Sequence, residues 1–183
     1  MSRISTHTVE DAPAASRPLL QKIVQATPTG RPANLHAQMA HSPAVLTAYT
    51  SLRAALAEHT TFDPKVGAAL TLATAASVGN DYMIRIASRL ALMNGWVEEQ
   101  VTVLRTGIPT RDAKIDALTR LAREAAANSG KVTDVTWRAA QQAGWSDRQL
   151  TDAFAYVGAT VFTGYFLNYA QTDMDALWQT ERS

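Results

Sequence analysis

The stretch DPKVGAALTLATAASVGNDYMIRIASRLALMNGW, residues 63–96, decides the fold class. Its first two residues, Asp63 and Pro64, have the chemistry of a helix start, because Asp accepts backbone hydrogen bonds at the N-cap and Pro fits the first turn. An apolar, alanine-rich run follows as far as Val78, where Gly79 breaks the helix. The absence of a polar face in this run predicts a helix that is buried nearly all round.

The same start and stop signals recur along the rest of the chain. Asn80 and Asp81 cap a second helix over residues 82–94. All seven prolines lie at or before Pro109, so nothing interrupts helices in the second half. Further helices are expected at 43–58, from Asp112 to near Gly130, and from a Ser146–Gln149 capping box onward. The sequence therefore predicts an all-α fold.

Two segments resemble each other at an offset of 49 residues. Six residues of the segment 89–102 recur in 138–151: Arg89, Ala91, Gly95, Trp96, Gln100 and Thr102 correspond to Arg138, Ala140, Gly144, Trp145, Gln149 and Thr151. Each copy has the pattern helix, Gly-Trp turn, helix, which predicts two related αα-hairpins. The alternative is that Gly-Trp turns are simply a common way to end a helix.

Composition excludes several functions. The length of 183 residues fits one domain, and a net charge of +1 without a basic stripe argues against a nucleic-acid partner. There is no cysteine, which excludes a disulfide, a thiolate nucleophile, an iron–sulfur cluster and cysteine-ligated zinc.

We expect residues 1–40 to form an N-terminal arm with a short helix near 19–25, and residues 41–183 to form the globular domain. The opening segment has no apolar core behind Arg3, so the expected location is the cytoplasm. An uncharged stretch over 153–172 contains several polar residues and two glycines, so we interpret it as a buried bundle helix and expect no membrane association.

Five segments occur in an order that resembles a known family: AHSPAVLTAY from Ala40, FDPK from Phe62, VGNDYM from Val78, LALMNGWVEEQV from Leu90 and FTGYFLNYAQTDMD from Phe162. Together they resemble the carboxymuconolactone decarboxylase family, in particular its alkyl hydroperoxidase D-like (AhpD-like) members. The resemblance covers residues 34–175. It implies an AhpD-like helical bundle and a homo-oligomer, as a dimer, trimer or hexamer.

Peroxidase members of that family carry a Cys-x-x-Cys pair, a His four residues after the second Cys and a Glu twelve residues before the first. The resemblance places these four relay positions on Asn80, Met83, Ala87 and Ala68. An amide, a thioether and two methyl groups cannot exchange protons near pH 7, and a thioether cannot form the required disulfide. The sequence therefore excludes a thiol peroxidase.

Four residues beside the replaced relay are the candidate substrate-binding set: Asn80, Tyr82, Met83 and Arg85. The Arg85 guanidinium suits a ligand carboxylate, whereas the alternative is a solvated ion-pair ladder with Asp81 and Arg89. Tyr82 is a possible hydrogen-bond donor to a ligand, and packing is its alternative role. No catalytic residue is identified.

The four histidines, His7, His36, His41 and His59, lack the spacing of a helical metal site. We interpret them as surface or cap histidines, with a metal or general-base role as the alternative. We predict no metal site and no cofactor. Aromatic residues over 162–169 fit core or subunit packing, with a pocket lining as the alternative.

Three functional hypotheses follow. The first is an AhpD-like protein that binds a small organic acid or lactone, with lyase- or isomerase-type chemistry if it catalyses a reaction. The second is a non-catalytic oligomeric binding or scaffold protein. The third is the family's antioxidant alkyl hydroperoxidase activity, which the missing cysteines oppose.

Overall fold

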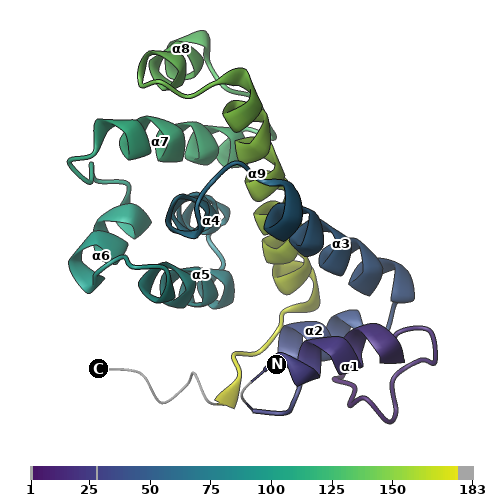
Figure 1. Cartoon of the computed structure of the whole chain (residues 1–183). Coiled ribbons are helices and arrows are strands. Elements are labelled where there is room, and N and C mark those ends of the chain that lie inside the picture. The colour runs from purple at the N-terminus through teal and green to yellow at the C-terminus, as the bar shows by residue number, and fades with distance from the viewer. Residues whose placement is uncertain (1, 28, 177–183) are drawn as a thin grey trace. The chain divides into compact units, whose positions relative to one another are not determined.

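The computed structural model describes residues 2–27 and 29–176 of the chain (Figure 1). These residues form nine α-helices and no strand, which confirms the all-α prediction. The helices are α1 (Arg17–Gln25), α2 (Asn34–Met39), α3 (Pro43–His59), α4 (Pro64–Val78), α5 (Asp81–Met93), α6 (Glu98–Thr106), α7 (Ala113–Ala127), α8 (Asp134–Gln142) and α9 (Asp147–Ala170).

The chain divides into two compact units. The first consists of the described parts of residues 1–54 and 166–183, and the second of residues 55–165, so both boundaries fall inside helices, α3 and α9. The expected boundary at residue 40 stays a prediction.

In the first unit, the beginning of the chain is hydrogen-bonded to residues near its end. The Arg3 backbone N–H donates to the Ala170 carbonyl at 2.8 Å. The Gln38 side chain connects both segments, because its amide donates to the Ile4 carbonyl at 2.8 Å while its Oε1 accepts from the Thr172 hydroxyl at 2.6 Å. Gln38 is buried, so these bonds satisfy a side chain that water does not reach.

In the second unit, α4 is the central helix. It packs against α5, α6 and α7, and Figure 1 shows it between α5 and α7. Every residue from Gly67 to Ala75 is buried. This continuous burial agrees with the apolar run that predicted a helix covered on all sides.

The helix starts confirm the related hairpins. Helices α4 and α7 have 15 residues each and begin 49 residues apart, at Pro64 and Ala113. Their N-caps are equivalent aspartates: Asp63 accepts from the backbone three residues on at 2.9 Å, and Asp112 does the same at 3.1 Å. The repeat therefore begins at Asp63 and Asp112, before the segments 89–102 and 138–151 in which matching residues are seen in the sequence.

The tryptophans of the two Gly-Trp turns make the same contact in each copy. The Trp96 indole N–H donates to the Lys65 carbonyl at 2.8 Å, and the Trp145 indole N–H donates to the Lys114 carbonyl at 2.8 Å. Each lysine ammonium also lies over the tryptophan ring, at 4.8 Å and 4.4 Å from the centroid. Each tryptophan thus attaches its turn to the first turn of the helix that opens its copy.

Helix α9 is the longest helix, with 24 residues, and the predicted capping box starts it. The Ser146 N–H donates to the Gln149 side chain at 3.1 Å, and the Gln149 N–H donates to the Ser146 hydroxyl at 3.3 Å. None of the described helices combines the length and apolar character needed to cross a membrane.

Two glycines of α9 give a matched test of its packing. A Cβ on Gly164 would lie 2.8 Å from a Val78 methyl of α4, whereas a Cβ on Gly158 would meet no atom within 4 Å. Alanine favours a helix by up to about 1 kcal/mol over glycine, whereas overpacking costs about 1–3 kcal/mol. We therefore expect Gly158→Ala to raise the free energy of unfolding and Gly164→Ala to lower it. Urea denaturation measures both, and equal effects would contradict the close approach of α9 to α4.

Candidate functional site

The candidate site lies at the turn between α4 and α5. Helix α4 ends at Gly79, whose φ of 73° is left-handed and whose N–H donates to the Ala75 carbonyl at 3.1 Å. Glycine adopts this conformation without the strain that a Cβ would impose. Asn80 follows in an extended conformation and caps α5, because its side-chain oxygen accepts from the Met83 N–H at 2.9 Å.

Asn80 is the position to which the family resemblance assigns the first relay cysteine. An N-cap residue lies at the positive end of the helix dipole, where a thiol would be held as the thiolate. In this chain the same position carries the Asn80 amide, which is neutral and serves the helix as a cap. The Asn80 side chain therefore has a structural role as the cap of α5.

The other three positions that the resemblance assigns to the relay lie in the interior. Ala68 on α4 and Met83 and Ala87 on α5 are all buried. Their spacing on α5 places Met83 and Ala87 on one face of that helix. The face consists of a thioether and methyl groups, so it offers apolar contact and no group that titrates near neutral pH.

The polar candidates differ in exposure. Tyr82 is only 3% exposed. Arg85 is half-buried, whereas Arg89, one turn later on α5, is exposed. A guanidinium that is partly withdrawn from water binds a carboxylate more strongly than an exposed one, because water screens the attraction less. Arg85 is therefore the better placed of the two arginines to hold an acid.

Two buried hydroxyl groups, one on α4 and one on α5, were not predicted from the sequence. The Oγ atoms of Thr74 on α4 and Ser88 on α5 are buried and have no hydrogen-bond partner among the described residues. Ser88 follows Arg85 by three residues, so the two lie on neighbouring positions of the helix surface. No pattern in the sequence distinguishes these hydroxyls from others that bond back to their own helix.

Two cavities occur elsewhere in the second unit. One of about 410 Å³ lies beside α6 and α7, and Arg120 and Arg123 are among its lining residues. The Arg123 guanidinium donates to the carbonyls of Leu104 and Arg105 near the end of α6, and burial lowers its pKa. Arg123 therefore has a structural role at a helix C-terminus.

The second cavity, of about 270 Å³, lies where α4 and α7 begin. Its lining includes Asp63, Asp112 and Trp96, whose polar groups serve the helix caps and the hairpin turn. In the described part of the chain, no group of three or more His, Asp or Glu residues is arranged to hold a metal ion.

Comparison with known proteins finds relatives among solved structures. No protein-family model matches the sequence, and no curated protein matches it. The chain matches an alkylhydroperoxidase AhpD core, an uncharacterized peroxidase-related protein from Ralstonia eutropha JMP134, with a TM-score of 0.81 and 16% identity over 97% of this chain and 94% of that one.

Two other matches are similar in extent. An uncharacterized peroxidase-related protein from Silicibacter sp. TM1040 matches with a TM-score of 0.78 and 14% identity over 98% of each chain. A cysteine-to-alanine variant of the debrominase Bmp8 in complex with 2,3,4-tribromopyrrole matches with a TM-score of 0.76 and 11% identity over 96% of this chain and 93% of that one. At these identities the matches establish the fold, so the chain has the AhpD-like fold without any cysteine.

Proposed function

We propose that this chain is a thiol-independent binding protein of the AhpD-like fold, whose ligand is a small organic acid or a lactone. The observation that carries the proposal is the bound state of the debrominase Bmp8, in which a variant with alanine in place of a cysteine holds 2,3,4-tribromopyrrole. A protein of this fold can therefore bind a small ring compound without that thiol. The absence of cysteine from our chain excludes thiol redox chemistry but leaves binding open.

The ligand would lie beside the first turns of α5. Met83 and Ala87 supply an apolar face, and Arg85 supplies a positive charge for a carboxylate or a lactone carbonyl. Tyr82 and Asn80 are the further polar contacts. Any reaction would be of the lyase or isomerase type, because such reactions need no group that is oxidised or reduced in turnover.

Arg85→Ala is expected to weaken ligand binding at least tenfold, because a hydrogen bond to a charged group is worth about 1.5–3 kcal/mol. The screen uses unsaturated dicarboxylates, their lactones and hydroxylated aromatic acids, with the thermal midpoint as readout. A ligand at 100 times its Kd stabilises the folded state by about 2.7 kcal/mol. Calorimetric titration then gives the Kd of the wild type and of each variant.

Arg89→Ala is the matched control, since Arg89 is exposed on the same helix. It should leave the Kd unchanged. A ligand whose affinity survives Arg85→Ala would place the binding site elsewhere, and no thermal shift across the panel would overturn the proposal. Hydroperoxide turnover should be undetectable, and its detection would contradict the exclusion of peroxidase chemistry.

One observation favours a second candidate, a non-catalytic oligomeric scaffold. Phe154 and Tyr165 on α9 are exposed by 64% and 57%. Their spacing of 11 residues places them on one side of the helix. Large exposed aromatic side chains in a row are typical of a surface that another chain covers, which fits the expected homo-oligomer. Sedimentation of the wild type and of Tyr165→Glu tests whether this face holds copies together.

A further inference from the structure

The larger cavity of the second unit is formed by α6, α7 and the loop between them, which can be followed in Figure 1. Its volume of about 410 Å³ lies within the range of about 300–1,000 Å³ that is usual for small-molecule sites. Half of its lining is aliphatic: Leu104, Ile108, Pro109, Ala117 and Ala139. Ile108 is 59% exposed, so part of this apolar lining meets water. The cavity therefore offers an apolar surface to a ligand of small-molecule size.

Two polar side chains of α7 hold the walls of this cavity in place. Asp116 Oδ1 accepts from the backbone N–H and from the hydroxyl of Thr110, each at 2.7 Å, which holds the α6–α7 loop against α7. Seven residues after Asp116, the Arg123 guanidinium donates to the carbonyls of Leu104 and Arg105 near the end of α6. Both the loop and the end of α6 are thus attached to α7, so the cavity is already formed before a ligand enters.

Arg120 is the polar lining residue that these contacts leave for a ligand. It lies four residues after Asp116 and three before Arg123, so all three share one face of α7. The remaining polar lining residue, Thr119, donates its hydroxyl to the Ile115 carbonyl at 3.0 Å within its own helix. Arg120 is exposed, so its guanidinium is accessible from solvent.

Glu124, one turn after Arg120, is engaged elsewhere. Its carboxylate accepts from the Thr133 N–H at 2.6 Å, where α8 begins. Hydrogen bonds from Thr136 and Thr133 lower the pKa of Glu124, and attraction to Arg120 contributes least to this shift. The positive charge of Arg120 is therefore only weakly compensated by this neighbour and can pair with an anion from outside.

The first copy of the repeat shows that this face is open only on α7. At the offset of 49 residues, positions 116, 117, 120 and 123 of α7 correspond to positions 67, 68, 71 and 74 of α4. The four α4 residues are small and all buried: Gly67, Ala68, Thr71 and Thr74. None of the four equivalent α7 residues is buried, and three of them are charged. The charged side chains thus occur in the copy whose face borders a cavity.

We propose that this cavity binds a small monocarboxylic acid with an apolar body, whose carboxylate pairs with Arg120. Two guanidinium groups and one carboxylate leave the lining with a net positive charge, and an arginine fork suits a carboxylate. The Asp116 carboxylate would repel a second acidic group, which favours one charge on the ligand. The aliphatic lining contacts the body of the acid. Among the described residues, the lining contains none of α5, so this site is independent of the one proposed beside Arg85.

Calorimetric titration with phenylacetate, 4-phenylbutyrate and decanoate tests the proposal. We expect at least one of these acids to bind with one molecule per chain. The primary amide of that acid has the same body without the charge and should bind at least tenfold more weakly. Arg120→Gln should weaken binding of the acid at least tenfold, because it removes the charged partner. Ala117→Leu should do the same, because the larger side chain occupies part of the cavity.

Arg138→Gln is the matched control, since this guanidinium on α8 has a side chain that is 73% exposed and lies outside the cavity lining. It should leave the Kd unchanged, as should Arg85→Ala. Circular dichroism checks that each variant is folded, and Ala117→Val replaces Ala117→Leu if the latter is not. Failure of the wild type to bind any of the three acids would overturn the proposal, and so would equal binding of acid and amide. Unchanged affinity in Arg120→Gln or in the Ala117 variant would also overturn it, and a loss in Arg85→Ala would assign the acid to the α5 site instead.

Discussion

The free energy of unfolding is expected to fall by roughly 3 kcal/mol between pH 7 and pH 4 because of one imidazole. This imidazole belongs to His36 on α2, whose Nε2 lies 3.1 Å from the Tyr49 hydroxyl. Its Nδ1 is buried and has no hydrogen-bond partner among the described residues. Burial lowers the pKa of His36 from 6.5 to about 4; the Asp175 carboxylate opposes this change and the Arg53 guanidinium adds to it.

The direction follows from proton binding. Between pH 6.5 and about 4, His36 binds a proton in the unfolded chain but not in the folded chain. The stabilisation is therefore complete above pH 6.5, decreases as the pH falls through this window and is absent below it. Burial also raises the pKa of Tyr49, so its hydroxyl stays neutral throughout.

Urea denaturation at closely spaced pH values measures this loss. Other groups with lowered pKa values act at lower pH: hydrogen bonds from Thr136 and Thr133 lower the pKa of Glu124, and those from Ser2 lower the pKa of Asp173. His36→Leu should flatten the curve between pH 6.5 and 4.5, whereas His59→Leu should leave its slope unchanged. An unaltered slope in His36→Leu would mean that His36 binds its proton over the same pH range in the folded and unfolded states.

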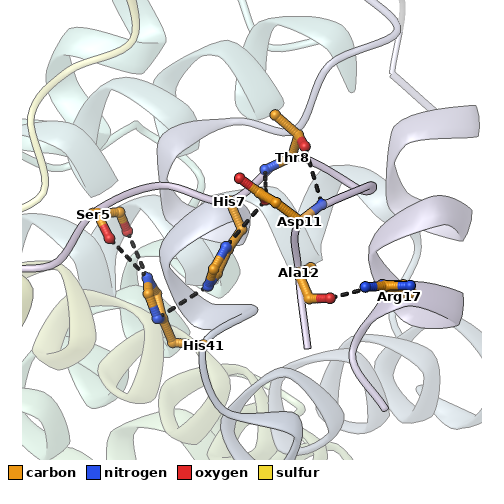
Figure 2. A network of polar contacts seen from close by, with 7 residues as sticks. All are labelled: Ser5, His7, Thr8, Asp11, Ala12, Arg17 and His41. Carbon is orange, nitrogen blue, oxygen red and sulfur yellow. Dashed lines mark hydrogen bonds and ion pairs between the residues drawn. The ribbon is translucent and has the colours of Figure 1, made fainter. Parts of the chain in front are cut away.

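The burial of His36 was not predicted from the sequence, and the reason is physical. Interpretation as a surface or cap residue rests on local context, in which His36 and His41 are five residues apart in or near a loop. Its surroundings depend on Tyr49, which lies 13 residues further on, and on the position of Asp175 near the end of the chain. The contact between His7 and His41 (Figure 2) likewise joins residues that are 34 positions apart, and no spacing in the sequence predicts it.

Helix starts show the opposite case. Asp63, Asn80 and Asp112 each accept a backbone hydrogen bond within the next three residues. These bonds are local, so the residue type at the cap suffices to predict where α4, α5 and α7 begin. Helix α2 was missed because its N-cap, Ala33, makes no side-chain bond. The first N–H of α2, on Asn34, donates instead to Asp175 at 2.8 Å, from the other end of the chain.

The candidate site can be predicted from the sequence only in part. Helix geometry alone places Met83 and Ala87 on one face of α5, and in the structure both are buried. The difference in exposure between Arg85 and Arg89 depends on what packs against α5, so the sequence left both arginines as candidates. Which ligand the site accepts is set by the shape and charge of the assembled surface, and no single residue type encodes it.

The two tryptophans of the hairpin turns give the largest expected losses of stability. Trp96→Ala and Trp145→Ala should each cost about 3–5 kcal/mol, the usual cost of truncating a buried tryptophan. Trp145 should be the more costly, because its ring also meets Phe62 edge-on at a centroid distance of 5.4 Å. Such an aromatic pair adds about 0.5–1.5 kcal/mol. The difference between the losses in unfolding free energy of the two variants therefore measures the contribution of the Phe62–Trp145 contact.

Trp137→Ala is the control in urea denaturation, because Trp137 is 39% exposed on α8 and should cost far less. Domains of this size are stable by about 5–15 kcal/mol, so the double variant at Trp96 and Trp145 should be largely unfolded at 25 °C. A cost of either buried tryptophan as low as that of Trp137 would show that the turn contacts to Lys65 and Lys114 do not hold the hairpins together. A loss of at least about 3 kcal/mol from each variant would mean that both copies depend on the same indole contact, as expected of a duplicated hairpin.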